Sequence, residues 1–299
     1  MMTHKWIATP SRTNAILKKY QIDAKKSLGQ NFLMEPQILQ DMLSAAEVDQ
    51  QTDVIEIGPG IGALTEFLVE YGRRVLAYEL DDRLLAVLVE ELGQYENLTV
   101  KHQDILKADV SADIQAYFPE SERLAVVANL PYYITTPILF HLLSASSMIS
   151  TYALMMQLEV AQRLIAEPGS KTYGSLSVAI QYYCDATIAQ HVPRTVFKPR
   201  PNVDSAILLL KRLDHPRVEV DDEDFFFTMM RGSFQHRRKT LWNNLRNLFG
   251  KEADTTASLE DALMQVAIDP KRRAETLTLE EFAALANVLT ADERIHLSE

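Results

Sequence analysis

Residues 52–62, TDVIEIGPGIG, are the stretch most informative about the fold, because a short apolar run leads here into three glycines within five residues. Short runs of this kind are typical of strands buried in a parallel sheet. Glycine is needed after such a strand where the chain turns sharply and a ligand approaches the backbone without a Cβ clash. The stretch therefore predicts a buried strand followed by a ligand-binding turn.

The chain around this stretch alternates between short apolar runs and longer helix-like segments. Further strands are predicted at 73–80, 98–104, 123–130, 151–158 and 206–213. Helices are predicted over 63–72 and 82–95, where glycines near the ends act as stops. Strands alternating with helices predict an α/β fold class with a doubly wound, Rossmann-like and mostly parallel sheet.

The character of the sequence changes near residue 214. Helical patterns then follow over 225–250, 258–268 and 278–290. The chain is therefore expected to have three parts. These are a basic N-terminal arm over 1–26, a catalytic domain over 27–213 and a small all-helical domain over 214–299.

Length and composition limit the classes of protein to which this chain can belong. With 299 residues, 47% hydrophobic and 24% charged, the chain can bury a sizeable core. No apolar run approaches the roughly 18 residues of a membrane span, and the basic first residues lack the apolar core of a secretory signal. The lone Cys184 is expected to fill the core, and no CxxC or HExxH pattern indicates a metal. We expect a cytoplasmic, metal-free protein, with a monomer as the default.

The net charge of −11 hides an uneven distribution. Residues 1–26 carry six basic side chains against Asp23 alone, and residues 194–246 carry eleven against seven acidic ones. Within the second segment, residues 231–246 hold five basic residues and no acid. Basic segments in an otherwise acidic protein are typical of a protein that binds a phosphate backbone at one face. Solvent-exposed helix faces give the same pattern.

Two carboxylates follow the next two predicted strands. Glu79 ends the second strand, 21 residues beyond Gly58, where it can accept hydrogen bonds from both ribose hydroxyls of a nucleoside. Asp104 ends the third strand and is placed to accept from an adenine amino group. With Gly58 and Gly60 on the turn, these residues predict a nucleoside-binding site. The alternative for both carboxylates is capping of the helices that follow.

A dinucleotide-binding dehydrogenase is the competing interpretation of the glycine turn. Gly58, Gly60 and Ala63 also satisfy the G-x-G-x-x-G/A pattern. Three glycines in five residues, preceded by Glu56, suit a nucleoside better than a pyrophosphate. A nicotinamide oxidoreductase would also leave the run at 129–132 without a role.

The fourth strand ends in Asn129-Leu130-Pro131-Tyr132, which resembles the catalytic Asn/Asp-Pro-Pro-Tyr/Phe motif of amino-methyltransferases. An exocyclic amine is a poor nucleophile because its lone pair is delocalised into the ring. The Asn129 side-chain oxygen and the Leu130 carbonyl can hold the amine hydrogens and favour a tetrahedral nitrogen. Pro131 stiffens the turn, while the Tyr132 ring can stack on the base and favour positive charge on nitrogen. Catalysis then comes mainly from positioning and electrostatics.

Four motifs in register resemble those of the ribosomal RNA adenine N6,N6-dimethyltransferases, and the resemblance covers nearly the whole chain. The motifs are residues 26–33 (KSLGQNFL), 54–62, 129–138 and 196–205 (VFKPRPNVDS). The chain is most similar to the KsgA-type bacterial enzymes of this family, which modify two adjacent adenosines in a hairpin loop near the 3′ end of small-subunit RNA. Two alternatives stay open, namely a resistance-type enzyme for large-subunit RNA and a non-catalytic RNA-binding assembly factor.

The resemblance implies S-adenosylmethionine as the cofactor and small-subunit ribosomal RNA, or its precursor particle, as the partner. It implies cofactor contacts at Asn31, Leu33, Gly58, Glu79, Asp104 and Asn129. It also implies that Phe197 lines the target-adenine pocket opposite Tyr132, although a core phenylalanine between two prolines fits the same residues.

The substrate must present an accessible adenine, because pairing in a helix hides N6. RNA loops offer splayed bases that stack on aromatic side chains. We expect residues 231–239, on the helical domain, to grip phosphates, with Arg237, Arg238 and Lys239 central because the segment has no acid. Lys25, Lys26 and the rest of the basic arm are weaker candidates.

Overall fold

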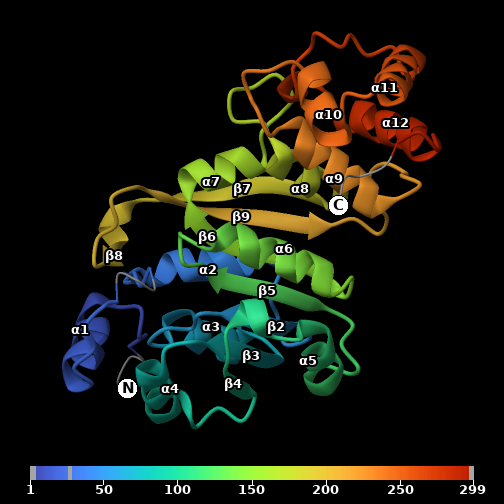
Figure 1. Cartoon of the computed structure of the whole chain (residues 1–299). Helices are drawn as coiled ribbons and strands as arrows, with labels where there is room; N and C mark the ends of the chain where they lie inside the picture. Colours follow the sequence, from blue (N-terminus) through green and yellow to red (C-terminus); the bar gives the residue numbers. More distant parts are fainter. Residues whose placement is uncertain (1–4, 26–28, 296–299) are drawn as a thin grey trace. The chain divides into compact units, whose positions relative to one another are not determined.

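Strand β2 (Asp53–Ile57) is the first predicted strand, and all five of its residues are buried. It lies in the middle of a sheet in the computed structural model of the chain, which describes residues 5–25 and 29–295. Within those ranges the sheet has seven strands in the order β4-β3-β2-β5-β6-β9-β7, which Figure 1 shows from β4 upward. Neighbours from β4 to β6 run parallel, and β9 pairs antiparallel with β6.

The other strands of this sheet confirm the predicted ones. They are β3 (Arg74–Glu79), β4 (Leu98–His102), β5 (Leu124–Asn129), β6 (Ile149–Gln157) and β9 (Ser205–Arg212). Strand β7 (Cys184–Val192) was not predicted, although its residues alternate between more and less buried, as in a half-buried strand. A separate antiparallel pair joins β1 (Phe32–Leu33) to β8 (Phe197–Lys198).

The order of the strands creates a crevice at one edge of the sheet. The chain leaves β2 for β3 and β4 on one side and then returns to β5 and β6 on the other. In an open parallel sheet, ligands bind where this reversal separates the carboxyl ends of neighbouring strands. The glycine turn follows β2, and residues 129–132 begin at the end of β5. The topology therefore brings both predicted motifs to one place.

Helices connect the strands, and α3 (Ala63–Tyr71) and α4 (Asp82–Leu92) follow the prediction. The helices that were not predicted include α2 (Pro36–Ala45), α5 (Val110–Tyr117) and α6 (Thr135–Ala145). Along the described residues, no helix is both long enough and apolar enough to cross a membrane.

Residues 5–25 pack against the sheet domain, whereas the sequence led us to expect an arm. Helix α1 (Pro10–Lys19) lies in this segment, and Ile7, Ile16 and Ile22 belong to the main hydrophobic cluster. Arg12 forms an ion pair of 2.7 Å with Glu66 of α3, whose side chain is only 1% exposed. The prediction of an arm rested on the excess of basic residues. It overlooked the few apolar side chains that hold the segment against the domain.

The chain divides into two compact units, Met1–Ala161 with Thr187–Arg212 and Gln162–Ala186 with Leu213–Glu299. The second unit is mostly helical. Its helices include α8 (Ser175–Tyr183), α9 (Glu223–Ser233), α10 (Leu241–Phe249), α11 (Ala253–Gln265) and α12 (Leu279–Thr290), and α7 (Leu158–Leu164) crosses the boundary. The predicted start at 214 agrees with the later boundary, but residues 162–186 also join this unit. They do so because α8 packs on α9, where Tyr182 stacks on Phe226 with ring centres 5.3 Å apart.

The helix predicted over 225–250 is two helices, α9 and α10, with a loop at 234–240. A Cβ on Gly232 would come within 2.6 Å of Leu248, so α9 and α10 pack closely at this glycine. Thr240 then caps α10 through its hydroxyl, which accepts from the Asn243 N–H. The basic residues predicted to lie on a helix therefore lie mainly on a loop.

Candidate active site

The glycine turn forms one wall of a pocket at the carboxyl ends of β2 and β5. Gly58 has a φ of +68°, and a Cβ there would meet nothing within 4 Å. The left-handed backbone favours glycine, and a side chain at this position would fill part of the pocket. Gly62, with a φ of +88°, is required for packing instead, because a Cβ would lie 2.7 Å from Leu92. Gly58 therefore leaves the pocket open, and Gly62 allows close packing against Leu92 of α4.

Glu79 stands at the end of β3, as predicted, and is 5% exposed. Its Oε2 accepts from the Gly60 N–H at 3.0 Å, and its Oε1 accepts from the Leu80 and Asp81 N–H groups at 2.8 Å each. Burial raises the pKa of Glu79, although the three N–H donors favour the charged carboxylate. A carboxylate has about four acceptor positions, so one position remains for a ligand hydroxyl, whereas the prediction required two.

Glu56 is a buried carboxyl residue with one oxygen that has no partner among the described residues. It sits within β2, lines the pocket and is 1% exposed. Its Oε2 has no hydrogen-bond partner among the described residues. Burial raises the pKa of Glu56 to about 8, and the charge of Glu79 acts in the same direction. A buried acceptor without a partner beside a pocket suits a polar ligand that would supply the missing donor.

Asp104 lies where β4 ends and lines the same pocket. Its Oδ1 accepts from the Leu106 N–H at 3.0 Å and caps a short 3-10 turn (Ile105–Lys107). Capping was the alternative reading of this residue, and the structure shows that it takes place. One capping bond leaves acceptor positions on the carboxylate, so capping and ligand binding are compatible.

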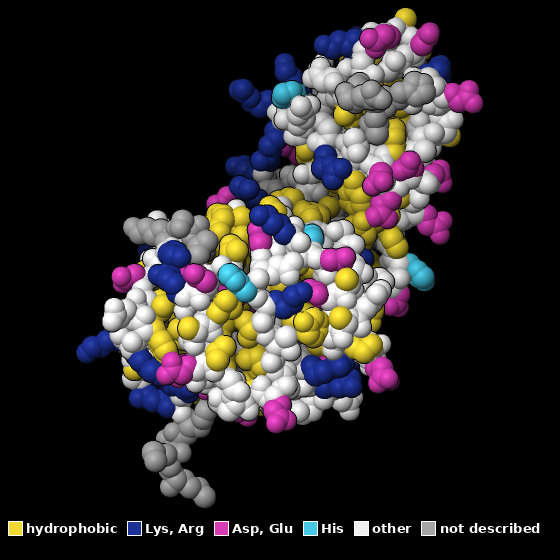
Figure 2. Space-filling model, turned by 60° about the horizontal axis from the view of Figure 1, so that its bottom comes forward, with side chains coloured by type: hydrophobic (Ala, Val, Ile, Leu, Met, Phe, Trp, Pro, Cys, Tyr) yellow, Lys and Arg dark blue, Asp and Glu magenta, His cyan; other side chains and the backbone are white. Residues whose placement is uncertain are grey.

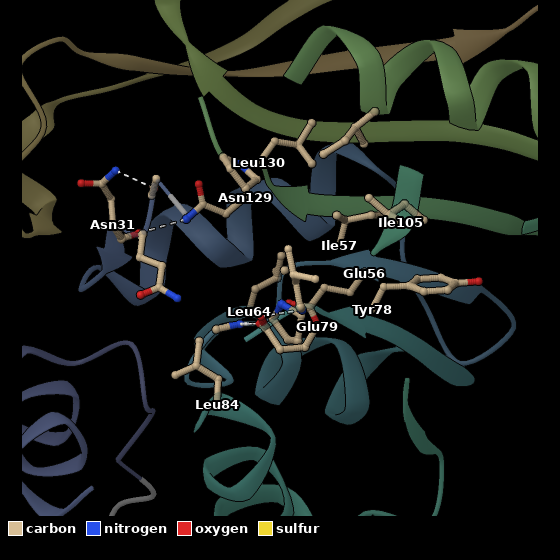
Figure 3. Close-up of a pocket in the computed structure, with 18 of the residues that line it drawn as sticks. Asn31, Glu56, Ile57, Leu64, Tyr78, Glu79, Leu84, Ile105, Asn129 and Leu130 are labelled. Carbon is tan, nitrogen blue, oxygen red and sulfur yellow. Dashed lines mark hydrogen bonds between the residues drawn. The ribbon is translucent and has the colours of Figure 1, made fainter. Parts of the chain in front are cut away.

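Asn129 and Asn31 meet across the pocket entrance, although they are 98 residues apart in the sequence. The Asn129 Nδ2 donates to the Asn31 carbonyl at 3.3 Å, and the Asn31 side chain donates to the Gly29 carbonyl at 3.0 Å. Figure 3 shows Asn31 beside Asn129, with Glu79 and Leu84 below them in this view. The Asn129 Oδ1 accepts from none of the residues that the structure describes, so it is available as an acceptor.

The three residues after Asn129 are fixed by backbone bonds and one hydroxyl. The Leu130 N–H donates to Met155 of β6 at 3.0 Å, and its carbonyl accepts from no described residue. Pro131 accepts from the Ile134 N–H at 3.3 Å, which closes the turn. The Tyr132 hydroxyl lies 2.6 Å from the Ser205 hydroxyl, and burial raises the pKa of Tyr132.

The pocket gathers every predicted cofactor residue within the first unit. The lining includes Asn31, Leu33, Gly58, Gly60, Glu79, Asp104, Asn129, Leu130, Pro131 and Tyr132. Phe197 is not among the lining residues. It is 3% exposed on β8, opposite Leu33 of β1, and belongs to the hydrophobic cluster. The structure favours the core-packing reading of Phe197.

The predicted phosphate-binding residues lie in the second unit, on the loop after α9. A hollow there is lined by Gln235, His236, Arg237, Arg238, Lys239 and Asn247. The Arg237 guanidinium donates to the Lys171 carbonyl at 2.6 Å and lies 3.6 Å from Glu275. Arg238 and Lys239 form no ion pair with a described residue. Residues 26–28, which include the candidate Lys26, lie outside the described part of the chain.

One polar cluster beside the pocket was not predicted. Asp81, whose side chain is fully buried, accepts from Lys25 at 3.2 Å, Gln30 at 2.9 Å and Arg83 at 2.6 Å. These donors hold the pKa of Asp81 well below its usual range, the Arg83 guanidinium most of all. The cluster ties the segment before Asn31 to the end of β3. The sequence signal was weak, because Lys25 and Gln30 lie more than fifty residues before Asp81.

Comparisons with known proteins agree with this arrangement. A sequence model described as ribosomal RNA adenine dimethylase matches residues 21–285. Two similar relatives are called Ribosomal RNA small subunit methyltransferase A. The one from Enterococcus faecalis is 54% identical over 97% of this chain and 98% of its own length, and the one from Streptococcus pyogenes serotype M4 is 53% identical over 95% of each.

Two solved structures share the fold over most of the chain. A dimethyladenosine transferase from Plasmodium falciparum has a TM-score of 0.70 and 26% identity, covering 85% of this chain and 95% of that one. The 23S rRNA methyltransferase ErmE has a TM-score of 0.63 and 28% identity, covering 86% and 99%. The matches confirm the predicted fold class and overturn the oxidoreductase alternative. The chain belongs to the ribosomal RNA adenine dimethylase family.

Proposed function

We propose that the enzyme transfers methyl groups from S-adenosylmethionine to N6 of two adjacent adenosines near the 3′ end of small-subunit (16S) ribosomal RNA, in a hairpin loop. The observation that supports this most is the meeting of Asn129 and Leu130 with the glycine turn and Glu79 around one pocket. Small-subunit RNA is favoured because the two relatives above, at 54% and 53% identity, carry that substrate in their names, whereas ErmE is 28% identical. We also propose that the enzyme works in the cytoplasm and as a monomer.

The described residues fit the cofactor. S-adenosylmethionine, when bound, supplies a methyl group on a positively charged sulfur. Glu79 has an open acceptor position for a ribose hydroxyl, and Asp104 keeps acceptors for an adenine amino group. Gly58 leaves space for close approach, and the Oε2 of Glu56 offers a buried acceptor for a charged donor.

Asn129 and Leu130 are the residues that would hold the target amine. The Asn129 Oδ1 and the Leu130 carbonyl are both free of described partners, and each can accept one N6 hydrogen. Two acceptors fixed in this way keep the nitrogen lone pair out of conjugation with the ring and aimed toward the cofactor. No side chain needs to remove a proton first, because the product ammonium can lose it afterwards.

Tyr132 would provide the face on which the target adenine stacks. Its hydroxyl bond to Ser205 of β9 fixes the ring in the pocket wall. The π face of a tyrosine also stabilises positive charge, which develops on N6 as the methyl group is transferred. Phe197 is too buried to share this role without a rearrangement of β1 and β8.

The helical unit would bind phosphates of the RNA through the loop at 234–240. Figure 2 shows Lys and Arg side chains gathered along one side of the upper part, with Asp and Glu side chains on the other. Arg238 and Lys239 line a hollow on this unit and have no carboxylate partner among the described residues. An unpaired cation loses little when it binds a phosphate, since no internal ion pair has to break.

Transfer of labelled methyl groups to ribosomal subunits tests this proposal. Unmethylated small subunits and large subunits are incubated separately with the enzyme and S-adenosylmethionine, and the nucleosides are analysed. We expect N6,N6-dimethyladenosine in small-subunit RNA alone. Transfer to large-subunit RNA would support the resistance-type alternative, and tight cofactor binding without transfer to either would support an assembly factor.

A further inference from the structure

Tyr133 is an aromatic residue of the pocket that has no role in the proposed mechanism. It follows Tyr132 directly, lines the same pocket and is 55% exposed. Its hydroxyl has no hydrogen-bond partner among the described residues, whereas the Tyr132 hydroxyl is bonded to Ser205. The two rings are therefore in different situations, one fixed in the wall and one open to solvent.

The Tyr133 ring is nevertheless held in place. A Cβ built on Gly29 would lie 3.3 Å from its Cδ1 and 3.4 Å from its Cε1, so the Gly29 backbone supports the ring on one side. The turn that carries Tyr133 is closed by the Ile134 N–H and the Thr135 hydroxyl, which both bond to the Pro131 carbonyl. An ordered, supported ring with more than half of its surface free has the form of a stacking platform.

The ligand that fits is a second nucleobase. The substrate in the proposed function is a pair of adjacent adenosines, and the target base enters at Asn129 and Leu130. The neighbouring nucleotide must leave the pocket past its rim, where Tyr133 lies four residues from Asn129 in the chain. Bases in RNA loops are splayed and gain by stacking on an exposed aromatic face.

We propose that Tyr133 stacks on the base of the nucleotide next to the target adenine, and so forms a second base site at the rim. This inference rests on the proposed function. A residue of the cofactor site would change cofactor affinity, whereas an exposed ring that contacts RNA would leave cofactor affinity unchanged. Stacking also differs from simple apolar packing, because only an aromatic side chain would replace tyrosine.

The test compares Tyr133→Ala, Tyr133→Leu and Tyr133→Phe for binding and methylation of unmethylated small subunits. Stacking of a base on an aromatic ring predicts a fall in RNA affinity of about tenfold or more in the alanine and leucine variants. The phenylalanine variant should restore the affinity. Tyr71→Ala, which removes a ring 44% exposed at the end of α3, is the matched control.

The outcomes separate the possible roles of Tyr133. Equal affinity of the alanine variant and the wild type would overturn the proposal, as would full affinity in the leucine variant. A loss of S-adenosylmethionine affinity as large as the loss of RNA affinity would assign Tyr133 to the cofactor site instead. If the wild type bound small subunits without methylating them, the proposed function would fail, while the affinities would still decide the role of Tyr133. Absence of binding in the wild type would overturn both.

Discussion

At the scale of single residues, the buried carboxyl of Glu56 makes stability depend on pH. Its folded pKa is about 8, against an ordinary value of 4.5. Between these values the folded protein binds more protons than the unfolded chain. The free energy of unfolding that Glu56 contributes therefore falls as pH rises through this window.

Replacement of Glu56 by glutamine should remove that dependence. The difference in unfolding free energy between Glu56→Gln and the wild type should grow in favour of the variant from about pH 5 to pH 8. Its slope should be at most about 1.4 kcal/mol per pH unit, the value for one proton. Urea denaturation at several pH values measures this, with the exposed Glu96→Gln as control. Parallel pH profiles of Glu56→Gln and the wild type would show that Glu56 is charged in the folded state.

The position of a single site residue was predictable from sequence where it follows from the strand that carries the residue. Gly58, Glu79 and Asn129 each end a recognisable strand, and the ends of parallel strands share one edge of a sheet. The hydrogen bond from Asn129 to Asn31 was not predictable, since it joins segments 98 residues apart. Burial of Glu56 was not predictable either, because a strand sequence does not reveal which carboxyl oxygen will be buried without a partner.

At the level of elements, helix α1 is joined to α3 by an ion pair with a buried carboxylate, besides its apolar packing. Arg12 joins Glu66, which is 1% exposed and also accepts from the Ile7 N–H at 2.6 Å. Removal of the cation leaves a buried carboxylate with less compensation, which is costly. Arg12→Ala should lower the free energy of unfolding by about 1–3 kcal/mol. Thermal denaturation measures the loss, and Lys18→Ala on the same helix should change it little. An unchanged Tm for Arg12→Ala would show that water replaces the guanidinium.

The loop between α9 and α10 is the element that should set the salt dependence of RNA binding. Neutralising Arg237, Arg238 and Lys239 together should weaken binding to small subunits and reduce the slope of log affinity against log salt by about 2. Filter binding at several salt concentrations measures the slope. The control is Arg217→Gln with Arg294→Gln, two cations of the same unit that are already paired with Asp185 and Asp292. An unchanged slope in the triple variant would remove this loop from the RNA site.

The elements themselves were predicted best where periodicity was strong. Strands β2 to β6 and helices α3 and α4 all followed their apolar patterns. The break between α9 and α10 was missed although residues 235–240 contain no apolar side chain, because the apolar patterns on either side were taken as one helix. The available signals were Gly232, one residue before α9 ends, and the N-cap Thr240, where α10 begins.

At the scale of the whole molecule, the sheet order explains why the site lies where it does. Reversal between β2 and β5 opens the crevice, and motifs from the first 140 residues converge there. The family and the fold class could be predicted from motif order. The division into units could be predicted only in part, because α8 joins the helical unit through contacts that are distant in sequence.

In the proposed mechanism, Asn129 and Leu130 hold the target amine beside a cofactor that Gly58 and Glu79 hold. Asn129→Ala tests it most directly, with S-adenosylmethionine affinity measured by calorimetry and methyl transfer measured on the same preparation. The loss of one positioned acceptor should lower kcat by about a hundredfold or more, while cofactor affinity falls less than about tenfold. Equal losses of transfer and cofactor affinity would contradict the claim and make Asn129 chiefly a cofactor ligand.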